Sequence, residues 1–176
     1  WPLMQVNGDE AFMIRTEGIR NPWYNARTGF PSVKMSTFLL DQLESTADPR
    51  LHKFFMLDQA GQYSGETNGL NDVAFGESNF AAKSDMGLAL SSQDSKMYMI
   101  TASEVWFLRA EAALIFQNDR AKANELYRKG IERSLHQWEI DGTEISNFMA
   151  SPITTLAGDN EEEQIGTQLW LALIPN

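Results

Sequence analysis

The amino-acid sequence predicts a mainly α-helical fold, and two observations carry this prediction. Apolar residues recur at three- and four-residue steps in three stretches, near residues 33–44, 101–138 and 161–173. Polar and acidic residues that suit helix starts stand at the beginning of the second and third stretches. The rest of the chain is predicted to form long irregular loops.

Residues 1–31 are predicted to be an irregular N-terminal stretch. Gly, Pro and Asn interrupt the apolar residues, and no helical or strand period lasts beyond about five positions. One short strand, from Ala11 to Arg15, is expected here.

Residues 32–57 are predicted to contain a helix followed by a short Asp-Pro-Arg-Leu segment. The helical pattern runs from about Val33 to Glu44. Pro49 excludes Asp48 from a helix.

A long loop is predicted over residues 58–95. The segment is dense in Gly, Ser, Asn and Asp, with scattered aromatic residues at Tyr63, Phe75 and Phe80. Loops of this length in compact domains usually carry function or are partly mobile.

A helical hairpin is predicted over residues 99–138. Thr101 and Glu104 fit a capping box that opens a helix to about Gln117. The small residues Ala110 and Ala113 would let a neighbouring helix approach closely.

The second helix of this hairpin follows a short connection. Asp119 is placed to cap it, and the apolar pattern continues to Trp138. Its outer face offers the pairs Glu125 with Lys129 and Arg128 with Glu132, which indicate a solvated surface.

A second loop, over residues 139–160, precedes a final helix over residues 161–176. Three glutamates open this helix, where negative charge suits the positive end of the helix dipole. The chain begins at Trp1 without a leader and ends directly after this helix, so we expect residues 1–176 to be one partial domain.

Composition excludes several classes of function. The 176 residues carry 24 Asp and Glu against 14 Lys and Arg, a net charge of −10, which argues against nucleic-acid binding. The absence of cysteine excludes thiolate chemistry and disulfides. The longest apolar runs, 112–116 and 170–174, are far shorter than the roughly 20 residues that cross a bilayer.

No common catalytic or cofactor motif occurs, so no catalytic residue, metal site or cofactor is predicted. A pair of carboxylates could act as a glycosidase pair, but sequence spacing selects none. The acidic run 159–163 could bind calcium, although at a helix start it serves the dipole more often.

The most site-like cluster lies in residues 21–27. Trp23 and Tyr24 offer flat apolar rings, and Arg27 offers hydrogen-bond donors, a combination that suits a sugar. Tyr63 is a further candidate in loop surroundings. The alternative for each aromatic residue is packing against the core.

Several stretches resemble the SusD/RagB-like family of glycan-binding proteins. Residues 99–113, MITASEVWFLRAEAA, resemble the family run "t-a-x-E-v-x-F-L-x-A-E-A-a". Residues 123–138 are similar to its "A-x-x-x-Y-x-x-G-I-x-x-S…w" pattern, and residues 48–51 and 168–170 fit other recurring stretches. The resemblance covers most of the chain after about Asn21, except for two loops.

The resemblance implies a tetratricopeptide-like hairpin within a larger SusD-like α fold. It further implies a non-enzymatic protein at the surface of the bacterial outer membrane that binds oligosaccharide or polysaccharide. Such proteins deliver the glycan to a TonB-dependent SusC-like transporter and meet the membrane only through a lipid anchor, which we expect to be absent from this chain. The hairpin motif is scaffold and assigns no ligand contacts.

Two other functions stay open. A tetratricopeptide-type protein-interaction module would use the hairpin to bind a peptide. A glycan-degrading enzyme would need two buried carboxylates at a cleft, at least one of them with a raised pKa.

Overall fold

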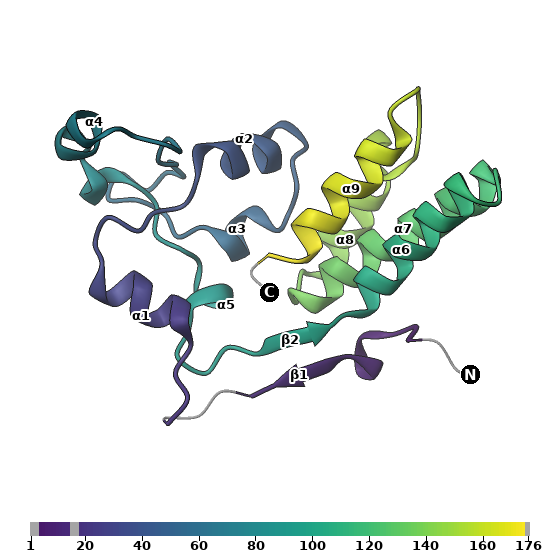
Figure 1. Ribbon diagram of the computed structural model, residues 1–176, viewed down its shortest axis with the longest axis horizontal. Coiled ribbons are helices and arrows are strands. Elements are labelled where there is room, and N and C mark those ends of the chain that lie inside the picture. The colour runs from purple at the N-terminus through teal and green to yellow at the C-terminus, as the bar shows by residue number, and fades with distance from the viewer. Residues whose placement is uncertain (1–3, 15–17, 175–176) are drawn as a thin grey trace. The chain divides into compact units, whose positions relative to one another are not determined.

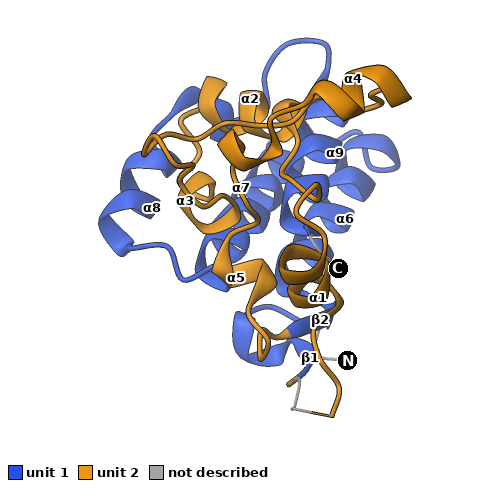
Figure 2. Ribbon diagram, turned by 90° about the vertical axis from the view of Figure 1, so that its left-hand side faces the viewer, with its two compact units in different colours: residues 1–13, 97–176 blue, residues 14–96 orange. Residues whose placement is uncertain are grey.

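The computed structural model describes residues 4–14 and 18–174. The chain divides into two compact units, which Figure 2 colours separately. The hairpin unit combines residues 1–13 with residues 97–176, and the loop unit consists of residues 14–96. Most regular structure among the described residues is helical, which confirms the predicted mainly α fold.

The hairpin unit is a set of helices beside a two-stranded sheet (Figure 1). Its elements are the 3-10 helix η1 (Asn7–Asp9), β1 (Ala11–Met13), β2 (Met97–Ile100), α6 (Ala102–Ile115), α7 (Arg120–Gln137), α8 (Gly142–Met149), the 3-10 helix η3 (Pro152–Thr154) and α9 (Glu161–Ala172). β1 pairs antiparallel with β2, and α6 and α7 form a hairpin against which α9 packs. Arg15, at the end of the predicted first strand, lies outside the described residues.

Both helices of the hairpin begin where the sequence places their caps. Thr101 Oγ1 accepts a hydrogen bond from the Glu104 N–H at 3.1 Å. Asp119 Oδ1 accepts one from the Lys122 N–H at 2.9 Å. Each bond satisfies an amide that has no partner inside its own helix, so these caps define the two helix starts.

The two hairpin helices meet through small residues, as predicted. Ala110 and Ala113 are buried on α6, whereas Leu108 and Ile115 on its other side are about half exposed. The Phe107 side chain of α6 lies against Gly130 of α7. A Cβ added there would lie 2.7 Å from two carbons of the Phe107 ring.

We expect Gly130→Ala to lower the free energy of unfolding by about 1–3 kcal/mol, because the buried Phe107 ring has no room to move. This loss outweighs the gain of at most about 1 kcal/mol that alanine brings to a helix interior. Gly166→Ala on α9 is the matched control, since nothing lies within 4 Å of its added Cβ. Urea denaturation of both variants checks this, and equal stability of the two would contradict it.

Arg128 does not form the predicted pair with Glu132. Its guanidinium donates to the Thr154 carbonyl at 3.1 Å and to the Met149 carbonyl at 2.9 Å. An arginine has five donors in a fixed fork, so it can satisfy several carbonyls at the end of a helix at once. Through these hydrogen bonds Arg128 joins α7 to the end of α8 and to η3.

The predicted loop over residues 139–160 contains the helix α8, which corrects that prediction. Asp141 Oδ1 accepts a hydrogen bond from the Thr143 N–H at 2.8 Å and caps the helix. Ile145 and Phe148 form its buried face. At eight residues, α8 shows too few turns for a helical period to stand out in the sequence.

The loop unit contains short helices joined by long connections. They are α1 (Pro22–Gly29), α2 (Thr37–Ser45), α3 (Leu51–Phe54), α4 (Asp72–Glu77), the 3-10 helix η2 (Phe80–Ala82) and α5 (Leu88–Ser91). The buried apolar residues of this unit are Met35, Leu39, Leu40, Leu43, Phe54, Phe55 and Leu90.

The helix α1 was not predicted, and the expectation of irregular structure over residues 1–31 is wrong at this point. Asn21 Oδ1 accepts a hydrogen bond from the Trp23 N–H at 3.0 Å, and Pro22 occupies the first helical position. An Asn-Pro pair is typical of turns, but it equally suits the cap and first position of a helix. Asn21 also donates to the carbonyls of Leu90 and Ser92, which a sequence pattern cannot show.

The loop unit departs from the sequence prediction at two further places. The helix predicted from Val33 begins only at Thr37, because Met35 pairs its backbone with other segments and Ser36 caps the helix. The predicted loop over residues 58–95 contains α4, η2 and α5.

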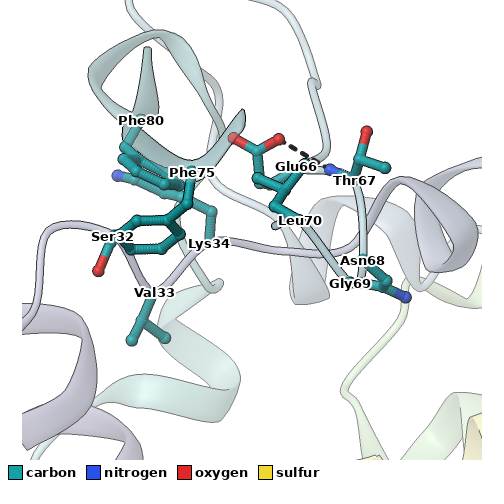
Figure 3. Close-up of a pocket in the computed structure, with 10 residues that line it drawn as sticks. All are labelled: Ser32, Val33, Lys34, Glu66, Thr67, Asn68, Gly69, Leu70, Phe75 and Phe80. Atoms are coloured by element: carbon teal, nitrogen blue, oxygen red, sulfur yellow. Dashed lines mark hydrogen bonds between the residues drawn. The ribbon is translucent and has the colours of Figure 1, made fainter. Parts of the chain in front are cut away.

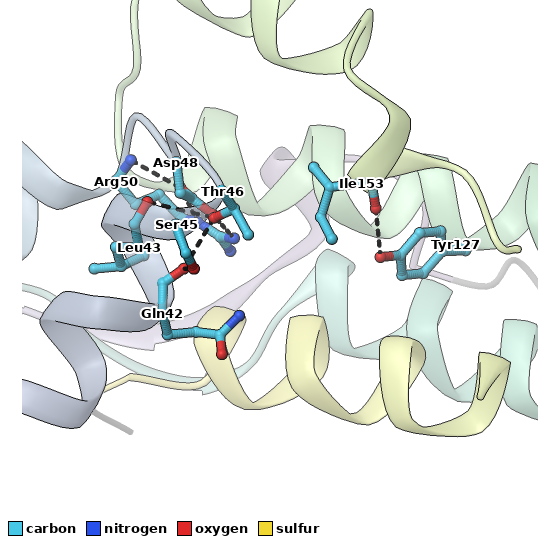
Figure 4. A network of polar contacts seen from close by, with 8 residues as sticks. All are labelled: Gln42, Leu43, Ser45, Thr46, Asp48, Arg50, Tyr127 and Ile153. Atoms are coloured by element: carbon cyan, nitrogen blue, oxygen red, sulfur yellow. Dashed lines mark hydrogen bonds and ion pairs between the residues drawn. The ribbon is translucent and has the colours of Figure 1, made fainter. Parts of the chain in front are cut away.

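A buried ion pair stabilises the turn between α2 and α3 (Figure 4). Asp48 Oδ2 lies 2.5 Å from Arg50 Nη2, and Asp48 Oδ1 accepts from both the backbone N–H and the Nε–H of Arg50 at 2.9 Å. Neither side chain is exposed to solvent. The Asp-Pro-Arg-Leu segment is therefore part of the scaffold.

Candidate functional site

Three segments of the loop unit are joined through their backbones into a small platform. The Met35 N–H donates to the Ser84 carbonyl at 3.2 Å, and the Met35 carbonyl accepts from the Glu66 N–H at 2.7 Å. The Thr37 N–H donates back to the Glu66 carbonyl at 2.9 Å. Residues far apart in the sequence are thus held at fixed positions, although much of this region has no regular secondary structure.

Two glycines allow these backbones to come close. A Cβ on Gly65 would lie 2.4 Å from the Thr37 Cα, and one on Gly87 would lie 2.0 Å from the Lys53 carbonyl oxygen. Backbone atoms cannot move aside as a side-chain tip can, so each position requires glycine. The backbone of the segment over residues 58–95 therefore packs directly against α2 at Gly65 and against α3 at Gly87.

The platform carries a pocket of about 330 Å³ (Figure 3). Its volume lies at the small end of the range of about 300–1,000 Å³ that is typical of ligand sites. It is lined by Ser32, Val33, Lys34, Glu66, Thr67, Asn68, Gly69, Leu70, Phe75 and Phe80.

Two phenylalanines form the aromatic part of the pocket. The ring centroids of Phe75 and Phe80 are 4.9 Å apart, with 53° between the ring planes. Phe75 is 48% exposed, so part of its ring is open to solvent although it packs against Phe80. An exposed ring in a concave surface offers a flat apolar contact to a ligand.

Glu66 is the carboxylate of the pocket. One of its oxygens accepts from the Thr67 N–H at 2.8 Å, and the other accepts from the Ser78 hydroxyl. The hydrogen bond from Ser78 is the largest of the effects that hold the pKa of Glu66 below its usual value of 4.5. Lys34 places its ammonium 2.6 Å from Asp85, so its charge is already paired.

The α1 residues predicted as a site lie on one short helix. Trp23 is 41% exposed, whereas Tyr24 and Arg27 are partly buried. The guanidinium carbon of Arg27 lies 5.9 Å from the centroid of the Tyr24 ring. The structure thus brings Tyr24 and Arg27 together. The indole ring of Trp23, which precedes Tyr24 in the sequence, is partly exposed to solvent.

Tyr63 lies in different surroundings. Its ring meets the buried Phe55 ring edge-on, at a centroid distance of 6.4 Å. Tyr63 is partly buried, and it does not line the pocket. Its role as a ligand contact stays a prediction.

Sequence reasoning did not select Phe75, Phe80 or Glu66 as site residues. The two phenylalanines stood out only as scattered aromatic residues in a polar segment. Their meeting depends on α4 and η2, which place them side by side. Glu66 is one acidic residue among 24, and nothing local distinguishes it.

The chain thus combines a helical hairpin in one unit with a small pocket of mixed polar and apolar lining in the loop unit. A family model described as "Starch-binding associating with outer membrane" matches residues 1–176. The chain therefore belongs to the SusD-like family.

Solved structures share the fold of this chain. The chain is similar to a chitin-binding SusD homologue from Flavobacterium johnsoniae, with 24% identity and a TM-score of 0.81 over 99% of this chain and 41% of that one. A SusD homologue from Bacteroides ovatus has 25% identity and a TM-score of 0.80 over 99% and 42% of the two chains. One from Bacteroides fragilis has 22% identity and a TM-score of 0.78 over 98% and 43%.

The chain spans about two fifths of the length of these structures. No curated protein matches it. Among residues 4–14 and 18–174, no helix combines the length and apolar character that a membrane crossing requires. Within the same residues, no three His, Asp or Glu side chains are grouped as metal ligands.

Proposed function

We propose that the chain is the pocket-bearing part of a protein that binds oligosaccharide or polysaccharide at the bacterial outer membrane without changing it chemically. Membership of a family described as starch-binding supports the ligand class. The observation that carries the proposal is a pocket lined both by the aromatic rings of Phe75 and Phe80 and by the polar residues Glu66 and Asn68.

The chemistry of the pocket suits a sugar. Sugar rings have C–H faces that pack on aromatic rings, and their hydroxyl groups need hydrogen-bond partners. The Glu66 carboxylate accepts hydrogen bonds, and the Asn68 amide both donates and accepts them. A pocket of about 330 Å³ would hold a short part of a longer glycan.

The pocket does not favour glycan cleavage. Glycosidases use two carboxyl groups, and the acid of the pair has a raised pKa. Only one carboxylate lines this pocket, and the pKa of Glu66 is lowered instead. This supports binding without reaction.

We further propose that residues 1–176 form part of one larger domain, which a lipid anchor holds at the cell surface. That domain would pass its glycan to a TonB-dependent SusC-like transporter. The larger size of the solved SusD homologues supports the first point. Copurification of the protein with a transporter encoded beside it would test the second, and a protein that purifies alone after crosslinking would contradict it.

Calorimetric titration of the chain against a panel of starch, chitin and plant polysaccharides tests the ligand class. We expect saturable binding to at least one member of the panel, and chromatography of the incubated glycan should show no shorter products. Absence of binding across the panel would remove the proposal. Release of shorter products would replace it with an enzymatic function.

A further inference from the structure

The segment that builds most of the pocket is strongly acidic. Residues 58–95 contain six Asp and Glu but a single basic residue, Lys83. This segment therefore carries half of the net charge of −10 of the whole chain. Of these six acidic residues, Glu66 lines the pocket itself.

Within the pocket lining, Glu66 contributes a charge that no ion pair neutralises. Lys34, the basic residue of the lining, is paired with Asp85 at 2.6 Å. Lys83 acts on Glu66 only through space and does not line the pocket. Because the Ser78 hydroxyl lowers the pKa of Glu66, the carboxylate stays ionised at neutral pH.

We propose that this pocket selects neutral over acidic oligosaccharides, because the carboxylate of Glu66 repels the carboxylates of uronic acid units. The inference rests on the proposed glycan-binding function and adds the charge class of the ligand.

The selectivity follows from what each kind of sugar offers to Glu66. A neutral sugar presents hydroxyl groups, and each can donate a hydrogen bond to a carboxylate oxygen. A uronic acid unit presents an ionised carboxylate, which can only accept hydrogen bonds and carries a like charge. The rings of Phe75 and Phe80 contact the C–H face of either sugar, so they do not discriminate.

Matched hexasaccharides test the proposal on the intact chain. Titrations at about 20 mM NaCl compare chitohexaose and maltohexaose with hexagalacturonate. We expect the better neutral hexasaccharide to bind about tenfold more tightly than the galacturonate. At about 0.5 M NaCl the difference should shrink to about twofold, because salt screens the repulsion.

The variant Glu66→Gln tests whether Glu66 causes the selectivity for neutral hexasaccharides. We expect it to reduce the ratio of galacturonate Kd to neutral Kd by about threefold at low salt. Glu111→Gln is the matched control, because it removes one negative charge from an exposed position on α6 and should leave the ratio unchanged. A ratio that falls equally in both variants would assign selectivity to net charge and overturn the role of Glu66.

The outcomes separate this inference from the function on which it rests. Galacturonate that binds as tightly as, or more tightly than, the neutral sugars at low salt overturns the charge selectivity and leaves glycan binding standing. Failure of every hexasaccharide and every polysaccharide of the panel to bind removes the proposed function, and the inference falls with it.

Discussion

Replacing Asp48 with alanine is expected to lower the free energy of unfolding by about 3–5 kcal/mol. The substitution leaves the Arg50 guanidinium without the carboxylate that contacts it through Nε and Nη2, and Arg50 has no exposed surface through which water could compensate. Native proteins are stable by only about 5–15 kcal/mol, so this loss is a large part of the total.

A surface ion-pair cluster provides the control. Glu125 on α7 binds both Lys122 at 2.8 Å and Lys129 at 2.7 Å, but its side chain is 48% exposed. Glu125→Ala should lower the stability far less than Asp48→Ala although it breaks two ion pairs, because water replaces them. Urea denaturation of Asp48→Ala and Glu125→Ala measures the difference, and equal losses would contradict a structural role for the buried pair.

A double substitution shows whether the cost comes from the unpaired charge. Replacing Asp48 with leucine and Arg50 with methionine removes both charges and leaves apolar groups in a buried site. We expect this variant to be more stable than Asp48→Ala, since replacing both partners of a buried pair is often neutral or stabilising. A double variant as unstable as Asp48→Ala would assign the loss to packing.

Replacing Phe75 with alanine is expected to weaken glycan binding at least about tenfold. The ring supplies the half-exposed apolar face of the pocket, and it also orients Phe80 at a centroid distance of 4.9 Å. Its loss therefore removes one contact and releases another. Titration with the tightest glycan of the polysaccharide panel measures the change.

Phe116→Ala is the matched control for Phe75→Ala. Phe116 is 84% exposed and does not line the pocket, so its replacement removes an exposed ring and leaves the pocket lining unchanged. Thermal denaturation of both variants separates a binding defect from unfolding. Unchanged affinity in a folded Phe75→Ala variant would contradict the pocket as the glycan site, and the same titration of Trp23→Ala would then test the predicted site on α1.

The hairpin could be predicted because its signals are local. Thr101 and Asp119 cap helices within their own first turns, and the apolar pattern that follows repeats over several turns. Each signal lies within a few residues of the structure that it specifies. Because these interactions join residues close together in the sequence, a sequence pattern can report them.

The short helices and the pocket could not be predicted in this way. Pro22 suits a turn as well as a helix start. In the folded chain, Asn21 donates hydrogen bonds to the carbonyls of Leu90 and Ser92, which lie about 70 positions away in the sequence. In the pocket, Lys34 lies far along the chain from Glu66 and Phe75, which belong to the segment 58–95. These residues differ from others of the same types only because the folded chain brings them together in one pocket.

Composition and local pattern alone are sufficient to establish a mainly helical chain with a capped hairpin, a strongly negative charge and no cysteine chemistry. The position of the pocket depends instead on backbone bonds of Met35 and on the close approach at Gly65, which join distant segments. The physical reason is the distance along the sequence over which each kind of interaction acts. Capping and periodicity act within one or two turns, whereas a binding pocket exists only where non-local contacts bring its walls together.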